Sequence, residues 1–203
     1  MKMQTIIFFV RHGNVYNPTN VWYGRLPNFG LSKEGEKQIE QTANFLAKQN
    51  IDRLFSSPLL RAKQTATIIN KKLRLPAINF TQDLLEIDSS LQGTSFSYIK
   101  TLNYDVFASS AKKDIQGETI EEVLTRMQKF VTSIINNHAG EKIVAVSHGD
   151  PIMLIKAALE GLPIINDSLR PGSARYMQQG EIYKITCDEN IPLILESVFK
   201  PLL

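Results

Sequence analysis

An Arg-His-Gly triplet follows a short apolar stretch near the start of the chain. Residues 6–10 are apolar and predict a buried strand, which is followed directly by Arg11, His12 and Gly13. The guanidinium of Arg11 is a planar, permanently charged fork that suits a phosphate group. The imidazole of His12 has a nitrogen that is partly unprotonated near neutral pH and can act as a nucleophile. Taken alone, the triplet also fits a charged strand end beside a buried, hydrogen-bonded histidine.

Three more chemically useful residues come after predicted strands. They are Arg61, in the helix after a strand at 51–56, Glu86, after a strand at 76–80, and His148, after a strand at 142–146. Taken one at a time, Arg61 also fits a solvated helix residue, Glu86 a surface carboxylate and His148 a helix cap. In a parallel sheet, however, the carboxyl ends of the strands meet at one edge, where ligands of open α/β sheets bind. Together with His12 they predict a phosphate site that holds a nucleophile and a proton donor.

The elements that must position these residues alternate along the chain. The pattern predicts helices at about 32–49, after Pro58, at 118–137 and up to Glu160, and a C-terminal hairpin at 181–186 and 191–199. This order predicts an α/β fold, a three-layer sandwich with a mostly parallel sheet. We expect one domain over residues 1–203. Its irregular region at about 84–116, with a helical tendency only near 98–107, is expected to form a cap over the strand ends.

Composition excludes several classes of protein. The chain has 203 residues, is 43% hydrophobic and 21% charged, and so can bury a full core. Its net charge of +3 is too small to indicate a nucleic-acid partner. The single cysteine, Cys187, allows no intramolecular disulfide and suits a reducing compartment. With no signal-like segment and no apolar run near the ~20 residues of a membrane helix, we expect a cytoplasmic protein without membrane partners. Its oligomeric state is not indicated.

The motifs around these residues resemble those of the histidine phosphatase superfamily, the phosphoglycerate-mutase-like family. The matching stretches, in the family's order, are Arg11-His12-Gly13 with Asn17, residues 56–66 around Arg61, Leu85-Glu86-Ile87-Asp88, Gly117-Glu118-Thr119, and Val146-Ser147-His148-Gly149. They span residues 6–159. The resemblance implies the phosphoglycerate-mutase-like fold.

The resemblance also implies a role for each matching residue. His12 would be the nucleophile that forms a phosphohistidine, Glu86 the proton donor and later the base, and Arg11, Asn17, Arg61 and His148 the phosphate-binding residues. The cations would hold the phosphoryl oxygens and disfavour a proton on His12. A backbone carbonyl would fix the tautomer of His12. Because arginines supply the positive charge, neither a metal ion nor a cofactor is expected.

The chain departs from the family at Asn14 and Val15, where an acidic or hydroxyl residue and then a hydroxyl residue are common. We expect altered hydrogen bonding there rather than inactivity. The region from 89 to 116 is shorter than the insertion of the mutases, and the basic C-terminal tail typical of the cofactor-dependent mutases has no counterpart here. Both differences favour hydrolysis over transfer between two hydroxyl groups.

The expected function is therefore hydrolysis of a small phosphorylated metabolite by a metal-independent phosphomonoesterase. The alternatives are a phosphoglycerate mutase, which is an isomerase, and a protein-phosphohistidine phosphatase or phospholigand-binding regulator. Presence of Glu86 favours alkyl esters, because an alkoxide needs a proton to leave. The side chains that could contact the substrate are Tyr23, Arg25, Tyr98, Tyr104 and Arg175, but the sequence does not identify that substrate.

Overall fold

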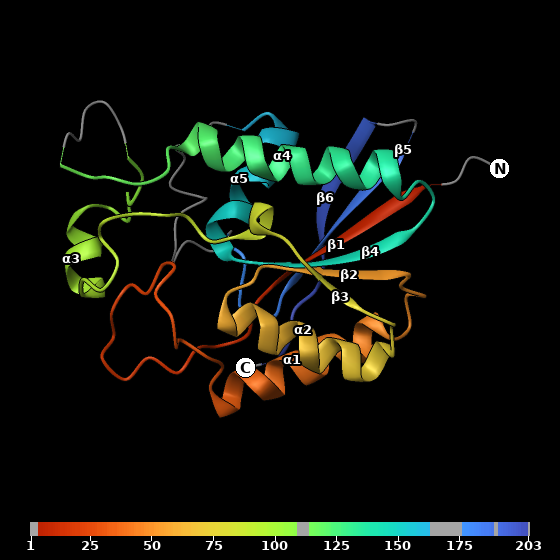
Figure 1. Ribbon diagram of the computed structural model, residues 1–203, viewed down its shortest axis with the longest axis horizontal. Helices are drawn as coiled ribbons and strands as arrows, with labels where there is room; N and C mark the ends of the chain where they lie inside the picture. Colours follow the sequence, from red (N-terminus) through yellow and green to blue (C-terminus); the bar gives the residue numbers. More distant parts are fainter. Residues whose placement is uncertain (1–3, 109–113, 163–175, 189–190, 203) are drawn as a thin grey trace.

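A computed structural model of the chain has one six-stranded sheet between two pairs of helices (Figure 1). The structure describes residues 4–108, 114–162, 176–188 and 191–202. The strands are β1 (Thr5–Arg11), β2 (Arg53–Ser56), β3 (Ile78–Phe80), β4 (Lys142–Ser147), β5 (Ile182–Asp188) and β6 (Ile191–Phe199). The helices are α1 (Lys33–Leu46), α2 (Leu60–Leu73), the short 3-10 helix η1 (Gln82–Leu84), α3 (Phe96–Thr101), α4 (Ile120–Asn137) and α5 (Gly149–Glu160).

The strand order is β3-β2-β4-β1-β5-β6. The pairs among β1 to β4 are parallel, whereas β5 is antiparallel to β1 and β6 is antiparallel to β5. The predicted α/β fold with a mostly parallel sheet and a C-terminal hairpin is confirmed. Because β1, β2 and β4 run side by side in one direction, the residues after them meet at one end of the sheet.

Each face of the sheet has its own hydrophobic core. Along β1, Ile7 and Phe9 pack with residues of α4 and α5, while Phe8 and Val10 pack with residues of α1 and α2. Successive side chains of a strand point to opposite faces. A strand covered by helices on both faces therefore reads as a continuous apolar run, which is why the sequence locates β1 and β4 so directly.

The helix boundaries follow local hydrogen bonding. Ser32 accepts a hydrogen bond from the N–H of Gly35, so it caps α1 as expected. The same helix ends at Leu46 rather than near residue 49, because the N–H groups of Lys48 and Gln49 bond three residues back, to Phe45 and Leu46. Such tighter bonds close the last turn of a helix.

Residues 81–108 hold η1 and one α-helix, α3, which lies earlier in the chain than the helix expected near 98–107. Ser95 accepts a hydrogen bond from the N–H of Tyr98 and so starts α3 at Phe96. Asn103 and Tyr104 have φ angles of 52° and 57°, a left-handed conformation that ends the helix long before residue 107. This region lies beyond the end of the sheet, next to the loop after β1 (Figure 1).

Three backbone hydrogen bonds join this region to the loop after β1, one of them from the N–H of Phe96 to the carbonyl of Asn20 at 3.2 Å. The N–H of Trp22 donates to the carbonyl of Thr94, and the N–H of Gly93 donates to the carbonyl of Trp22, both at 2.8 Å. Ile99 and Val106 are buried in the core on the α4 and α5 side. The region is thus anchored to the fold at both the loop and the core. In the described residues, no helix is long and apolar enough to cross a membrane.

Candidate active site

His12 lies directly after β1, with a side chain that is 1% exposed. Its Nδ1 is 2.8 Å from the carbonyl oxygen of Gly13. Its Nε2 accepts a hydrogen bond of 3.2 Å from Nε of Arg61. Both contacts are satisfied by a neutral ring with its proton on Nδ1. Nε2 therefore carries no proton, and its electron pair accepts the Arg61 hydrogen bond. The contact of Nδ1 with a backbone carbonyl is the one that the sequence analysis expected.

The charge of His12 is controlled by its surroundings. Burial and the positive charges of Arg61 and Arg11 lower the pKa of the His12 imidazole well below its ordinary value, while the hydrogen bond to Gly13 opposes them. The ring therefore stays unprotonated at neutral pH. A buried, neutral imidazole next to two guanidinium groups is suited to attack an anionic phosphoryl group that those cations hold.

Arg61, in the first turn of α2, is completely buried. It donates to Nε2 of His12 and, with its terminal nitrogen at 2.7 Å, to the carbonyl oxygen of Gly24. Its guanidinium also lies over the ring of Tyr23, 4.7 Å from the centroid. No carboxylate pairs with it among the ion pairs of the described residues. Its charge is thus available to an anionic ligand.

His148 follows β4 and stands beside His12, with the two ring centroids 5.2 Å apart. Its Nε2 is 2.8 Å from the hydroxyl oxygen of Ser57. Its Nδ1 is buried and has no hydrogen-bond partner among the described residues. Burial, and next the charge of Arg61, lower the pKa of His148 well below its ordinary value. A neutral ring with an unused nitrogen at this point can donate to a phosphoryl oxygen.

Glu86 comes from the segment after η1, and it lines the same pocket as His12. Its Oε2 lies 4.0 Å from Nδ1 of His148, and its Oε1 accepts a hydrogen bond of 3.1 Å from the N–H of Ile87. Burial, and then the charge of Asp150, raise the pKa of Glu86 to about 7, although Arg61 and the Ile87 hydrogen bond oppose them. The carboxyl group can therefore hold a proton near neutral pH, as a general acid must.

A second carboxyl group lies across this space. Asp150, in the first turn of α5, accepts a hydrogen bond of 2.6 Å from the hydroxyl of Tyr176. Burial raises the pKa of Asp150, while the Tyr176 hydrogen bond and Arg11 lower it. Two neighbouring carboxyl groups in a dry site do not both ionise readily, and here the charge of Asp150 raises the pKa of Glu86 whereas Glu86 is not among the groups that shift the pKa of Asp150. We therefore take Asp150 as ionised and Glu86 as the group that keeps the proton.

Arg11 is the last residue of β1. One of its terminal nitrogens donates to the carbonyl of Met177 at 2.5 Å, and its guanidinium lies 5.1 Å from the ring centroid of Tyr176. Its Nε is buried and has no hydrogen-bond partner in the described ranges. One guanidinium edge therefore remains for a ligand.

These groups surround a small pocket of about 70 Å³. The residues that line it are Arg11, His12, Trp22, Tyr23, Gly24, Glu86, Phe96, Ile99, Tyr104, Val106, Asp150 and Tyr176. Four of them, Phe96, Ile99, Tyr104 and Val106, come from the region that was predicted to cap the strand ends. Arg61 and His148 are not part of this lining but lie against His12, Arg61 through a hydrogen bond and His148 with its ring centroid 5.2 Å away.

Asn17 is the one predicted phosphate-binding residue that the structure places neither in the lining of the pocket nor against His12. Its side-chain amide donates to the carbonyl of Val21 at 2.8 Å and accepts from the N–H of Val21 at 3.3 Å. A short amide side chain readily bonds its own loop in this way. Its role in phosphate binding remains a prediction.

Of the side chains that were expected to contact the substrate, only some lie in the pocket. Tyr23 and Tyr104 line the pocket. Tyr98 is 49% exposed and Arg25 bonds to Glu86 and Glu118 instead. Arg175 lies outside the described residues.

Asn14 has a defined structural place. Its side chain accepts from the hydroxyl of Ser32 at 2.7 Å and donates to the side chain of Gln179 at 3.1 Å. It therefore links the turn after His12 to the start of α1 and to the segment before β5. Asn14 thus serves as a cross-link at the base of the site, consistent with a change of hydrogen bonding at this position.

Asp150 and Tyr176 were missed by sequence reasoning. Asp150 carried a usable signal, because it stands two residues after His148 in the first turn of a helix at a strand end. Tyr176 carried none, since the segment that brings it to the pocket has no regular pattern. No cluster of three His, Cys, Asp or Glu side chains suited to a metal ion occurs in the described part of the chain.

Comparison with known proteins gives consistent matches. The family model described as histidine phosphatase superfamily (branch 1) matches residues 7–194. The protein named Uncharacterized protein Rv0525 of Mycobacterium tuberculosis is 31% identical over 183 residues, which cover 84% of this chain and 86% of that protein. Phosphoserine phosphatase 1 of Hydrogenobacter thermophilus is 28% identical over 165 residues, which cover 78% and 77% of the two chains.

Among solved structures, a mycobacterial glucosyl-3-phosphoglycerate phosphatase matches with a TM-score of 0.77 and 23% identity, over 96% of this chain and 98% of that one. This likeness shows a shared fold. The predicted family, its phosphatase assignment and its phosphoglycerate-mutase-like fold are confirmed. The chain belongs to the histidine phosphatase superfamily.

Proposed function

We propose that the protein hydrolyses a small phosphomonoester through a phosphohistidine on His12, without a metal ion. The observation that carries this proposal is the contact between Arg61 and His12. It leaves an electron pair on Nε2 of a buried, neutral imidazole, within a pocket that also holds a carboxyl group able to keep a proton.

In the first step, Nε2 of His12 attacks the phosphorus atom and the bond from phosphorus to the ester oxygen breaks. Arg11 and Arg61 stabilise the negative charge on the phosphoryl oxygens, and Nδ1 of His148 donates to one of them. Charge stabilisation of this kind is the main contribution of proteins to phosphoryl transfer. Because two guanidinium groups supply it, turnover needs no added metal ion.

Glu86 gives its proton to the departing ester oxygen, so the product is an alcohol and the carboxyl group is left as a carboxylate. An alkoxide is a poor leaving group, and a raised pKa keeps the needed proton in place near pH 7. Asp150 assists because its charge opposes ionisation of Glu86.

In the second step, the Glu86 carboxylate takes a proton from water as the water oxygen attacks phosphorus. The bond from phosphorus to Nε2 then breaks, inorganic phosphate leaves, and both His12 and Glu86 return to their starting states. The same residue thus acts as acid and then as base, as microscopic reversibility requires.

A small substrate fits the surroundings of His12. The ring is 1% exposed, and the pocket is bounded by the region of Phe96 to Val106, which we propose acts as the cap. A phosphohistidine on the surface of another protein would reach this ring poorly. The relatives named phosphoserine phosphatase 1 and glucosyl-3-phosphoglycerate phosphatase take their names from small phosphorylated molecules, which supports the same substrate class.

The test is release of inorganic phosphate from a panel of phosphomonoesters in the presence of EDTA. The panel contains p-nitrophenyl phosphate, phosphoserine, glycerol and sugar phosphates, nucleoside monophosphates and 3-phosphoglycerate, and isomerisation of 3-phosphoglycerate is followed in parallel. A phosphohistidine protein is assayed beside the panel. We expect release from one or a few alkyl phosphates. Isomerisation without release would make the protein a mutase, and turnover of the phosphohistidine protein alone would make it protein-directed; either result overturns the proposal.

A further inference from the structure

The stretch Gly117-Glu118-Thr119, which matches a family motif, contributes no side chain to the pocket. It lies instead against the segment that carries Glu86. The N–H of Glu118 donates to the carbonyl of Asp88 at 2.9 Å, and the N–H of Asp88 donates to the Glu118 carboxylate at 3.1 Å. Glu118 therefore anchors the chain just after the proposed proton donor.

Arg126, on α4, divides its guanidinium donors between this segment and the carboxylate of Glu118. Its guanidinium makes five hydrogen bonds of 2.7 to 3.2 Å. Three go to the carbonyl oxygens of Asp83, Leu85 and Glu86, and two go to the carboxylate of Glu118. An arginine has five N–H donors in a rigid plane, whereas a lysine has three on a flexible chain. The contact set thus requires arginine.

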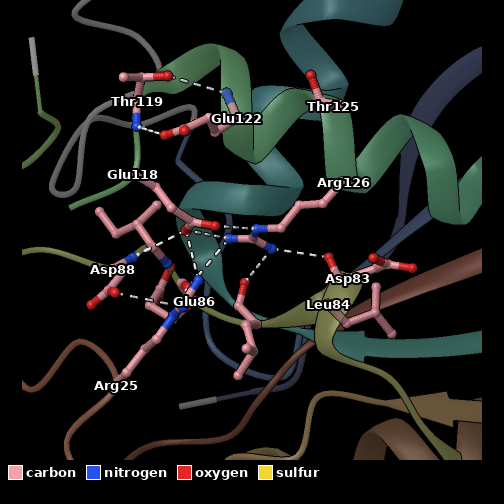
Figure 2. A network of polar contacts seen from close by, with 12 residues as sticks. Arg25, Asp83, Leu84, Glu86, Asp88, Glu118, Thr119, Glu122, Thr125 and Arg126 are labelled. Carbon is pink, nitrogen blue, oxygen red and sulfur yellow. Dashed lines mark hydrogen bonds and ion pairs between the residues drawn. The ribbon is translucent and has the colours of Figure 1, made fainter.

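Arg25 approaches from the opposite side, as Figure 2 shows. Its Nε donates to the carbonyl oxygen of Glu86 at 2.7 Å, and its terminal nitrogen donates to the Glu118 carboxylate at 2.6 Å. The Glu86 carbonyl thus accepts from two arginines, which is the full capacity of a carbonyl oxygen. We call Arg25, Glu118 and Arg126 the arginine clamp.

Opposite charges hold the three side chains of the arginine clamp together. Burial alone would raise the pKa of Glu118, but the hydrogen bonds and charges of Arg126 and Arg25 outweigh it and lower that pKa. Glu118 is therefore ionised and bridges the two guanidinium groups. The side chains of the three residues are only 13% to 23% exposed, so water screens these contacts weakly.

The clamp acts on the carboxyl group of Glu86 through one peptide plane. The carbonyl oxygen on one edge of the Glu86–Ile87 peptide is held by the two arginines. The N–H on the opposite edge donates to Oε1 of Glu86. Because a peptide unit is planar and rigid, fixing one edge fixes the other. The two arginines that hold the Glu86 carbonyl therefore also fix the direction of the Glu86 carboxyl group.

We propose that Arg25, Glu118 and Arg126 are positioning residues that aim the Glu86 carboxyl group at the leaving oxygen through the Glu86–Ile87 peptide. This inference rests on the proposed function. None of the three touches the substrate. Their loss displaces the proton donor while Arg11, His12, Arg61 and His148 keep their places. Misplacement by about 1 Å is enough to cost on the order of 100-fold in a catalysed step.

The leaving group distinguishes this role from a general loss of structure. A p-nitrophenolate ion leaves without a proton, whereas an alkoxide does not. The measurement is kcat for p-nitrophenyl phosphate and for the best alkyl phosphate, in wild type, Glu118→Gln and Arg126→Lys. The ratio of the two rates in one sample does not depend on how much of the protein is folded. We expect the ratio of alkyl to p-nitrophenyl turnover to fall by about tenfold or more in both variants.

Lys129→Gln is the matched control. Lys129 lies on α4, one turn after Arg126, and pairs with the carboxylate of Asp83 at 3.5 Å, but its side chain is 74% exposed. We expect its ratio to equal that of wild type, and the ratio of Glu86→Gln to be lower still.

Equal losses on both substrates in Glu118→Gln and Arg126→Lys would overturn the positioning role and leave a purely structural one. A ratio within about twofold of wild type would do the same, because displacement of a general acid changes such rates by ~10²–10⁴. A wild-type protein that hydrolyses neither substrate would instead overturn the proposed function. The two failures are thus distinguishable.

Discussion

Nε of Arg61 donates a hydrogen bond of 3.2 Å to Nε2 of His12, the nitrogen that must attack phosphorus. The second contact of the imidazole, from Nδ1 to the carbonyl of Gly13, places the ring proton on the far side. A bound phosphoryl oxygen that takes over the Arg61 hydrogen bond therefore frees the electron pair of His12 at the place where phosphorus arrives. One arginine thus holds the nucleophile ready and then binds its target.

Turnover should depend entirely on the imidazole of His12. His12→Ala should abolish turnover of every phosphomonoester, p-nitrophenyl phosphate included, because the neighbouring imidazole, His148, uses Nε2 on the hydroxyl of Ser57 and carries its proton on Nδ1 in the role proposed for it. Rapid quenching with radiolabelled substrate should show an acid-labile phosphoprotein in wild type and none in the variant. His138→Ala, which removes an imidazole at the end of α4, should retain both turnover and label. Turnover by His12→Ala above a tenth of the wild-type rate would contradict the assignment.

The pH dependence should report Glu86. Its pKa of about 7 means that its proton is lost as the pH rises above that value. The ratio of alkyl to p-nitrophenyl turnover should therefore fall above about pH 7. The ratio is informative above about pH 7 because the second pKa of a phosphomonoester is about 6 or lower, so both substrates are dianions there and the change in the ratio reports the protein. A ratio that stays constant from pH 6 to pH 9 would show that Glu86 is not the proton donor.

Asp150→Asn should move this pH dependence downward. Asp150 raises the pKa of Glu86, so removal of its charge makes Glu86 ionise at lower pH. Asparagine can still accept the hydrogen bond of Tyr176, and the pocket should keep its shape. Glu160→Gln, a neutralisation at the far end of the same helix, is the control and should leave the midpoint unchanged. A shift to higher pH in Asp150→Asn would show that the two carboxyl groups interact differently.

Much of this site was predictable because its residues sit next to the signals that define the elements. His12 and His148 directly follow apolar strands, and Arg61 follows the strand and proline that precede α2. The rule that parallel strands end at one edge then brings them together. None of these steps requires knowledge of a distant contact.

The remainder depends on how the loops fold and pack, which the local sequence pattern does not determine. Arg25 was predicted as a possible substrate contact, but it bonds Glu86 and Glu118, 61 and 93 residues away. Asn17 was predicted to assist phosphate binding, but its amide bonds Val21 in its own loop. In both cases the residue type was informative about hydrogen bonding, while the partner was decided by how the loops pack.

Ionisation of the buried Glu86 carboxyl group should also lower the stability of the folded protein. In the unfolded chain Glu86 ionises near its ordinary pKa of 4.5, but in the folded protein it ionises only at about 7. Between these values only the folded state binds the proton, so stability falls as the pH rises and is constant above about pH 7. At about 1.4 kcal/mol per pKa unit, the loss is on the order of 3 kcal/mol.

Glu86→Gln should remove this loss, because the amide is neutral and its oxygen can still accept from the N–H of Ile87. Thermal or urea unfolding should show the variant to be more stable than wild type at pH 8, and equally stable near pH 4. A variant that is less stable than wild type at pH 8 would mean that folding does not raise the pKa of Glu86.

Close packing behind the nucleophile gives a last expectation. Gly35, in the first turn of α1, is buried against the turn after His12, and a Cβ there would collide with the backbone oxygen of Asn14. Alanine normally favours a helix over glycine by about 1 kcal/mol. Here the collision should dominate, at a cost of ~1–3 kcal/mol and a fall in Tm of several degrees. Activity should fall as well, because Gly13, whose carbonyl orients His12, lies against the same turn of α1. Lys37→Ala, at an exposed position of the same helix, should leave both quantities near wild type. A Gly35→Ala protein with a higher Tm would show that the turn after His12 can move aside, and that the nucleophile is not held by the packing of α1.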